Sequence, residues 1–200
     1  MPTLILASRN AKKIGELRDL LAGEDIDVGG LDRVPAVAEI EETGSTFAEN
    51  AAIKATTVAT AGSCWAIGED SGLCVDALDG RPGLYSARYA GEHGNGAANN
   101  SKLVTELADV PGERRTARYR SAIAVADPTG EIVLTSEGEC RGLITLEPRG
   151  SNGFGYDPHF VVREYHRTFG ELPAAVKRAI SHRARAMRDL LPKLTAALRS

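Results

Sequence analysis

Two acidic segments contain the side chains of this sequence that are best suited to hold a divalent cation. Glu41 and Glu42 lie in EIEETGSTF, and Glu69 and Asp70 lie in GEDSG. Hard cations such as Mg²⁺ take oxygen ligands, typically one or two carboxylates together with substrate phosphates and water. Acidic residues are also common in ordinary turns and at helix starts. A charge pair inside β-like sequence is nevertheless costly unless it is used, so Glu69 and Asp70 favour a functional interpretation.

Basic side chains gather at two predicted helix starts. Lys12 and Lys13 follow a short apolar strand, and Lys177, His182 and Arg183 lie in KRAISHR. The unpaired N–H groups and the dipole of a helix start favour an anion, and a lysine adds a point charge. The first segment lacks the Walker pattern and is not a P-loop. Taken alone, each segment is also explained by a solvated basic surface.

The segment GSNGFGYDP, residues 150–158, combines glycines with Phe154 and Tyr156. Such a loop lets the backbone approach a flat ligand closely, with an aromatic ring available to stack on it. A β-turn with one ring in the core is an equally good interpretation. Considered together, the two acidic segments, the two basic helix starts and this loop would serve a divalent metal, phosphates and a stacked base.

The composition is typical of a globular protein of one domain or two small lobes. Of the 200 residues, 42% are hydrophobic and 26% are charged. A formal net charge of −3 argues against a general nucleic-acid or anionic-membrane surface, so any anion site is local. We see no secretory signal and no apolar run that could span a membrane. Cys64, Cys74 and Cys140 lack paired spacing and suggest reduced thiols, so we expect a cytoplasmic protein.

Strand and helix patterns alternate along the chain, which indicates an α/β protein with a mixed sheet. The predicted strands are 3–7, 26–31, two segments within 64–78 that are broken at a polar turn, and a hairpin over 116–144. The predicted helices are a first one capped by Asn10, then 45–62, 97–110, and 172–194 with an interruption near Ser181. Thr46 and Glu49 have the spacing of a capping box. The hairpin excludes a purely parallel sheet.

Five motifs in a fixed order resemble the inosine triphosphate pyrophosphatase family, whose members hydrolyse non-standard purine nucleoside triphosphates. They are ASRNAKK, EETGSTFAENAAIKA, EDSGLCVDALDGRPGLYSARYAG, GSNGFGYDP and KRAISHR, and the match runs from residue 4 to about residue 191. Each motif is weak alone, but this ordered set is specific. The resemblance implies a single domain over residues 1–200, with a long central mixed β-sheet flanked by helices and a nucleotide cleft between two lobes. It also implies Mg²⁺-dependent conversion of ITP, dITP and XTP to monophosphate and pyrophosphate by a homodimer.

The resemblance assigns roles to individual residues. Asp70 is expected to be the general base and a metal ligand, with Glu41 as a further metal ligand. Substrate contacts are expected at Ser8, Arg9, Asn10, Ala11, Lys12, Lys13, Ser71, Phe154, Gly155, Tyr156, Asp157, Lys177, His182 and Arg183.

This sequence departs from the family pattern at two places. Glu69 stands where the family usually has Asp, and GECRG, residues 138–142, stands where an aromatic–Pro pair is common. The sequence disfavours two other functions. A septum-associated pyrophosphatase that prefers pyrimidine or modified bases is disfavoured by FGYD and SHR. A catalytically silent nucleotide-binding protein is disfavoured by the presence of both Glu41 and Asp70.

Overall fold

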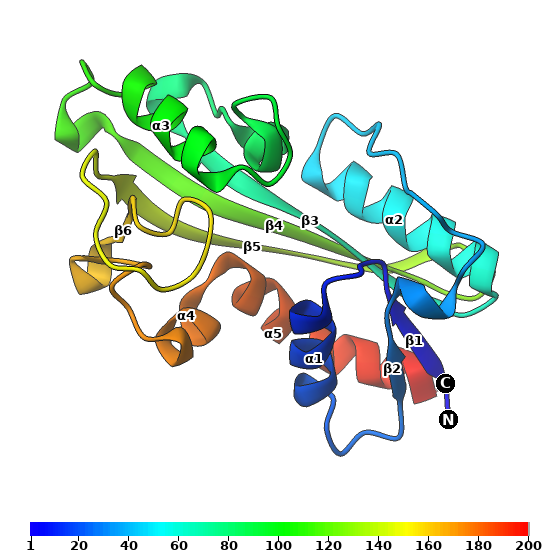
Figure 1. Cartoon of the computed structure of the whole chain (residues 1–200). Coiled ribbons are helices and arrows are strands. Elements are labelled where there is room, and N and C mark those ends of the chain that lie inside the picture. Colours follow the sequence, from blue (N-terminus) through cyan, green and yellow to red (C-terminus); the bar gives the residue numbers. More distant parts are fainter. Residues whose placement is uncertain (200) are drawn as a thin grey trace. The chain divides into compact units, whose positions relative to one another are not determined.

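The computed structural model describes residues 1–199 (Figure 1). Its strands are β1 (Thr3–Leu6), β2 (Asp27–Gly29), β3 (Trp65–Val75), β4 (Thr116–Ala126), β5 (Ile132–Ile144), β6 (Phe160–Val162) and β7 (Arg167–Thr168). Its α-helices are α1 (Ala11–Leu20), α2 (Phe47–Gly62), α3 (Gly96–Glu106), α4 (Ala174–Ile180) and α5 (His182–Arg199). Short 3₁₀ helices cover Leu31–Arg33, Asp76–Leu78, Gly83–Arg88, Gly112–Arg114 and Arg163–Tyr165.

The strands within the described range form one mixed sheet in the order β2-β1-β3-β4-β5-β6-β7. β1 pairs in parallel with β2 and β3, whereas β6 pairs in antiparallel fashion with β5 and β7. β4 and β5 are consecutive in the chain and neighbours in the sheet, and a turn at Asp127–Gly130 joins them. The predicted α/β class, the mixed sheet and the hairpin are therefore confirmed.

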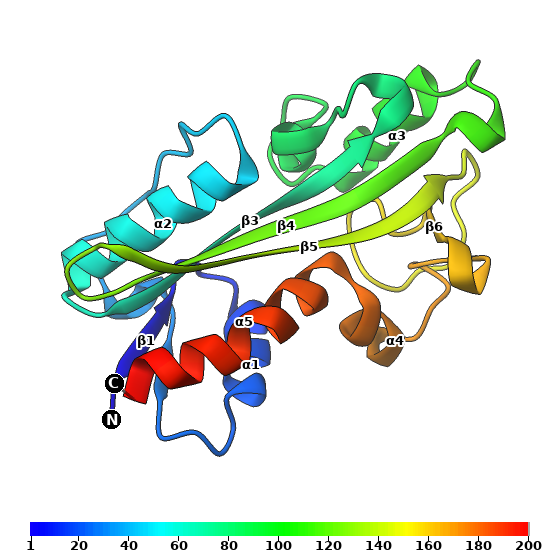
Figure 2. The same cartoon turned by 180° about the vertical axis from the view of Figure 1, so that it is seen from behind.

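The chain divides into two compact units. The first comprises residues 1–70, 122–137 and 186–200, and the second comprises residues 71–121 and 138–185. In the first unit, α1 and the C-terminal part of α5 lie on one side of the strands and α2 lies on the other (Figures 1 and 2). Leu17 of α1, Leu190 of α5, Ile67 of β3 and Val125 of β4 belong to one buried cluster on the α1 side.

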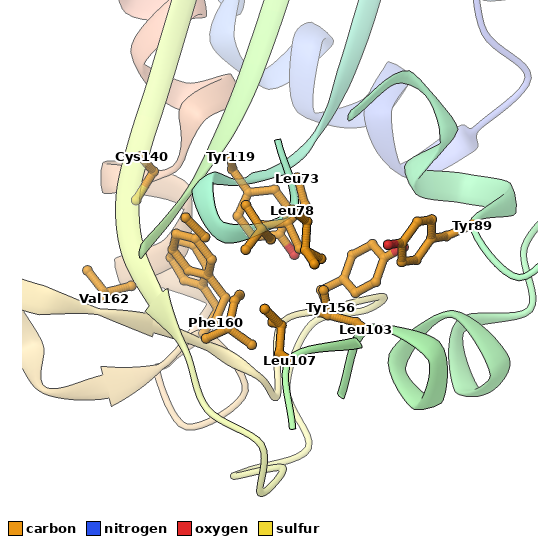
Figure 3. Packing of buried hydrophobic residues seen from close by; sticks show 14 of the residues in the cluster. Leu73, Leu78, Tyr89, Leu103, Leu107, Tyr119, Cys140, Tyr156, Phe160 and Val162 are labelled. Atoms are coloured by element: carbon orange, nitrogen blue, oxygen red, sulfur yellow. The ribbon is translucent and has the colours of Figure 1, made fainter. Parts of the chain in front are cut away.

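The second unit has its own core, which is rich in aromatic rings (Figure 3). Tyr119 of β4 lies with its ring centroid 4.7 Å from Phe160 and 6.2 Å from Phe169. Leu73 of β3 and Leu103 of α3 belong to the same cluster. Because aromatic side chains bury large apolar areas, this cluster fixes the strands and loops around it.

One predicted interruption is wrong. The polar segment within residues 64–78 does not break the strand, since β3 runs without a gap from Trp65 to Val75. Glu69 and Asp70 are accommodated because lysines from two helices neutralise them, and those partners are distant in sequence. Charges within a strand are costly unless they are paired, and here the pairing comes from tertiary contacts.

The predicted helix boundaries are largely confirmed. Asn10 caps α1, since its side-chain oxygen accepts hydrogen bonds from the N–H groups of Lys12 and Lys13. Thr46 caps α2 by accepting from the N–H of Glu49, and the Glu49 carboxylate accepts hydrogen bonds from the N–H and the hydroxyl of Ser45. The interruption near Ser181 separates α4 from α5.

Two further findings concern the chain as a whole. Cys64, Cys74 and Cys140 are free, and the last two are buried. Among residues 1–199 there is no helix whose length and apolar character would let it cross a membrane.

Gly68 provides a test of how α2 lies against the sheet. A Cβ at this residue of β3 would overlap the carbonyl oxygen of Ala51 and lie 2.6 Å from the nitrogen of Ala55. We expect Gly68→Ala to lower the free energy of unfolding by about 1–3 kcal/mol, the usual cost of overpacking, as measured by urea denaturation. Gly15→Ala is the control, because nothing lies within 4 Å of its Cβ and alanine favours a helix. A Gly68→Ala protein as stable as the wild type would contradict this packing.

Candidate active site

The alternation of side chains along β3 sends its two acidic residues to opposite faces of the sheet. Ile67 and Glu69 face the α1 side, where the Glu69 carboxylate lies 3.4 Å from the ammonium of Lys13. Gly68 and Asp70 face α2, whose backbone comes close because Gly68 has no side chain. A single strand therefore presents one carboxylate to each helix.

Asp70 is held by two residues of α2. The ammonium of Lys54 lies 3.3 Å from Asp70 Oδ1, and the amide of Asn50 donates to Asp70 Oδ2 at 3.1 Å. Asn50 is itself buried and fixed, because its oxygen accepts from the N–H of Gly44 at 2.8 Å. Lys54 also pairs with Glu42 at 2.7 Å and donates to the Glu69 carbonyl at 3.2 Å. The Asp70 carboxylate is therefore held in one orientation, because each of its oxygens has a partner on α2.

Burial raises the pKa of Asp70 above that of an ordinary aspartate. Lys54 and the hydrogen bond from Asn50 act in the opposite direction, and the nearby charge of Glu42 adds to the increase. The result is a carboxylate that is half-buried and has an increased affinity for a proton. These are the properties of a side chain that can accept a proton from water during a reaction.

The acidic residues around Asp70 suit a divalent cation. On this face of the sheet Lys54 pairs with both Glu42 and Asp70, so one positive charge meets two negative ones. No three His, Cys, Asp or Glu side chains of residues 1–199 gather as a preformed metal cage. Such a cage is not required for Mg²⁺, which is usually held by one or two carboxylates together with substrate phosphates and water.

The predicted metal ligand Glu41 and its neighbour Glu42 differ in their surroundings. Glu41 is exposed, whereas Glu42 is paired with Lys54, which also holds Asp70. The loop 41–44 is tied to Asp70 through Asn50. Both carboxylates thus belong to a short segment that is anchored beside Asp70, and the role of Glu41 stays a prediction.

In the basic segment at the start of α1, several backbone N–H groups already donate hydrogen bonds to side chains of the same segment. Asn10 occupies the N–H groups of Lys12 and Lys13, and Ser8 accepts from the N–H of Asn10 at 3.1 Å. Arg9 donates to the carbonyl of Val37 at 3.1 Å. Because these backbone donors already have partners, the positive charge that this segment offers an anion comes from the side chains of Arg9, Lys12 and Lys13, of which Lys13 pairs with Glu69. Ala11, Lys12 and Asn10 are exposed.

In the second unit, the loop 150–158 is built around the carboxylate of Asp157, which is only 1% exposed. Asp157 Oδ2 accepts from the N–H of Phe154 at 2.8 Å and forms an ion pair with Lys177 of α4. The Lys177 ammonium also lies 4.5 Å from the centroid of the Phe154 ring. The Phe154 side chain is 73% exposed, so a large part of an aromatic ring is available to a flat ligand.

Tyr156 and Gly155 fix this loop to neighbouring segments; Tyr156 is buried, whereas Gly155 is exposed like Phe154. The Tyr156 hydroxyl donates to the carbonyl of Ser86 at 2.8 Å, and the ring is buried in the core. The Gly155 carbonyl accepts from the amide of Asn100 at 3.0 Å. The expected substrate contacts of the loop are therefore divided, since Phe154 is exposed whereas Tyr156 and Asp157 lie in the interior.

The remaining predicted residues of the second unit lie at the α4–α5 junction and on β3. His182 stacks on Tyr119, with ring centroids 4.9 Å apart and an angle of 12° between the planes. Arg183 follows at the start of α5 and is half-buried. Ser71 is half-buried in β3, directly after Asp70.

Asn50 and Lys54 are the residues that sequence reasoning missed. Both lie in α2, four residues apart, on the stripe that also carries the buried residues Phe47, Ala51 and Ala55. A polar and a cationic side chain on the buried stripe of an amphipathic helix need partners, and this signal was present in FAENAAIKA.

Comparison with known proteins agrees with the resemblance drawn from the five motifs. The sequence profile of the Ham1 family matches residues 4–193, and the chain belongs to that family. The dITP/XTP pyrophosphatase of Rhodopirellula baltica is 51% identical over 96% of this chain and 92% of its own length. The dITP/XTP pyrophosphatase of Bacillus subtilis is 47% identical over 98% of both chains.

Solved structures of the family have the same fold. A HAM1 protein of Coxiella burnetii superposes with a TM-score of 0.92 at 39% identity, over 98% of this chain and all of that one. The nucleoside-triphosphatase, or dITP/XTP pyrophosphatase, of Mycobacterium abscessus gives a TM-score of 0.82 at 45% identity, over 96% of this chain and 99% of that one.

Removing the buried charge of Asp70 is expected to raise the stability of the protein and to lower its activity. A carboxyl whose pKa is raised by folding contributes stability below its unfolded pKa, and this contribution is lost as the pH rises through the folded pKa. At pH 7.5 the ionised group therefore destabilises the protein. We expect Asp70→Asn to raise the melting temperature without added metal at pH 7.5, and to lower kcat by about 10²–10⁴-fold, the usual loss of a general base.

The control is Asp19→Asn, which makes the same chemical change at an exposed position of α1. We expect this variant to retain the melting temperature and kcat of the wild type. Near-native kcat in Asp70→Asn would remove Asp70 from its role, and a lowered melting temperature would show that its pairing with Lys54 and Asn50 is mainly structural.

Proposed function

We propose that this protein hydrolyses ITP, dITP and XTP to the nucleoside monophosphate and pyrophosphate, and so removes deaminated purines from the nucleotide pool. The names of the relatives support the substrate class. The observation that carries the proposal is the half-buried Asp70, held by Lys54 and Asn50 with its pKa raised. Such a carboxylate suits the activation of water for attack on a phosphorus atom.

Asp70 and Glu41 are the proposed ligands of Mg²⁺, and the two carboxylates that share Lys54, those of Asp70 and Glu42, support a cation there. When bound, Mg²⁺ supplies positive charge that neutralises the phosphate oxygens of the substrate and of the leaving pyrophosphate. Asp70 accepts a proton from the attacking water. Lys13 adds positive charge toward the phosphates, and Lys177 holds a second positive charge at a fixed position beside Phe154. Phosphoryl-type transfer needs mainly positioning and electrostatics, so no covalent nucleophile is required.

The base is proposed to lie against Phe154, whose exposed ring offers a stacking surface. Arg183 is the proposed donor to the oxygen that hypoxanthine and xanthine carry at C6. Adenine has an amino group there, which would leave two donors facing each other. A buried polar group without a match costs about 1–3 kcal/mol, and sites built on such pairing can reject the wrong partner by about 10⁴-fold.

We further propose that the protein acts as a cytoplasmic homodimer. The exposed side chains of segment 80–91, GRPGLYSARYAG, are the proposed contributors to subunit or substrate contacts; Tyr85 is exposed, whereas Tyr89 lies in the core. Sedimentation velocity at micromolar concentration tests the dimer, because a single species of monomer mass would contradict it.

The reaction is tested by product analysis. Purified protein incubated with ITP and Mg²⁺ is expected to yield IMP and pyrophosphate in equal amounts, and chelation of the metal with EDTA is expected to stop the reaction. Chromatography of the nucleotides together with a pyrophosphate assay measures both. Release of IDP and orthophosphate would show that the bond between the β- and γ-phosphates is cleaved, and would contradict the proposal.

The role of Arg183 is tested by comparing two substrates. We expect Arg183→Ala to lower kcat/KM for ITP far more than for ATP, so that the preference between them shrinks. Arg178→Ala is the control, since Arg178 is exposed on the neighbouring helix α4. If both rates fell while their ratio stayed constant, Arg183 would be a phosphate-binding or structural residue.

A further inference from the structure

Tyr119 of β4 contacts two of the proposed substrate residues from within the core of the second unit. Its side chain is nearly buried, with 9% of the residue exposed. Its ring packs against Phe160 and Phe169, and the rings of these two residues are stacked on each other with centroids 5.4 Å apart. Because these rings hold Tyr119 in place, Tyr119 can in turn fix the positions of the residues that it contacts.

The first contact of Tyr119 is with His182 at the start of α5. The two rings are nearly parallel, at 12°, with centroids 4.9 Å apart. This stacking leaves the imidazole few orientations, since tilting it would cost the ring contact. Tyr119 therefore sets the plane in which His182 presents its nitrogen atoms.

The second contact is between the Tyr119 hydroxyl and the buried carboxylate of Asp157, whose charge and hydrogen bonding are among the causes that raise the pKa of Tyr119. Burial, followed by the charge of Asp157, holds the pKa of Tyr119 well above its ordinary value, so the hydroxyl remains a donor. The same carboxylate accepts from the Phe154 N–H and pairs with Lys177. The hydroxyl of Tyr119 thus supports the group that organises the loop bearing Phe154.

We propose that Tyr119 is a positioning residue for base recognition: it fixes the His182 ring and the Asp157 carboxylate relative to each other, so that the preference for hypoxanthine over adenine depends on it. The inference rests on the proposed function, in which the base lies against Phe154 and the neighbouring side chains of this unit. Tyr119 acts through these residues, because its own side chain is enclosed by Phe160, Phe169 and His182.

The test removes only the hydroxyl. In Tyr119→Phe the ring and its packing remain, but the hydrogen bond to Asp157 is lost. We expect kcat/KM for ITP to fall about tenfold, mainly through a higher KM, and the ITP-to-ATP ratio to shrink, since hydrogen bonds to charged groups have effects of roughly this size. Titration calorimetry with IMP and AMP is expected to show the same loss of preference without catalysis.

Tyr89→Phe is the matched control. Tyr89 is a buried tyrosine of the same core, and its hydroxyl donates to the carboxylate of Glu106 at 2.6 Å. The control thus loses the same kind of hydrogen bond, but not one that involves Asp157 or His182. We expect it to keep the wild-type ITP-to-ATP and IMP-to-AMP ratios, even if its melting temperature falls as much as that of Tyr119→Phe.

A second measurement follows the His182 ring directly. In the substrate-free protein, the chemical shift of the proton on His182 Cε1 includes a ring-current contribution from the stacked Tyr119 ring. We expect Tyr119→Leu to move this resonance strongly, and Tyr89→Phe to leave it in place.

The possible outcomes distinguish a failure of the role proposed for Tyr119 from a failure of the proposed function. An active wild type with an unchanged ITP-to-ATP ratio in Tyr119→Phe would overturn the role of Tyr119, as would an equal loss of preference in Tyr89→Phe. An unchanged His182 resonance in Tyr119→Leu would overturn the stacking on which the inference depends. A wild type that releases no pyrophosphate from ITP would instead overturn the proposed function itself.

Discussion

The close approach of α2 to β3 is the constraint on which the candidate site depends. Gly68 lets the helix backbone pass directly over the strand, so that Asn50 and Lys54 reach Asp70 two residues further along. Since side chains alternate along a strand, Asp70 points to this helix and Glu69 points to Lys13 on the other side. The identity of one small residue thereby determines whether the residues of α2 can compensate the charge of Asp70.

The second unit uses a different arrangement, in which one carboxylate organises a loop from within. Asp157 is almost inaccessible to solvent, yet it holds Lys177 and the backbone of Phe154. Burying an ion is favourable only where several donors satisfy it. Here the donors come from the loop, from α4 and from Tyr119 of β4, so the order of the loop depends on three segments that are separate in sequence.

Local patterns in the sequence were sufficient for most of the secondary structure. The caps at Asn10 and Thr46 and the turn at Asp127–Gly130 are read from neighbouring residues, and the structure has each of them. The break assigned to β3 was wrong because its charges are compensated by residues far along the chain. The contacts of Lys54 and of Tyr119 could not be predicted for the same reason: nothing near either residue specifies its partner. The resemblance to a family supplied the expected site residues, and the structure adds what surrounds each of them.

The burial of the cysteines has a consequence for the chemical durability of the protein. Only the thiolate form of a cysteine reacts readily with oxidants and alkylating agents. Burial raises the pKa of Cys140 to about 11, and also raises the pKa of Cys74 and of Cys64. At pH 7.5 the Cys140 thiol, with its pKa of about 11, is ionised to only about 0.03%, whereas an unperturbed thiol is ionised to about 10%. The core thiol Cys140 therefore resists electrophiles through its low ionisation as well as through its inaccessibility.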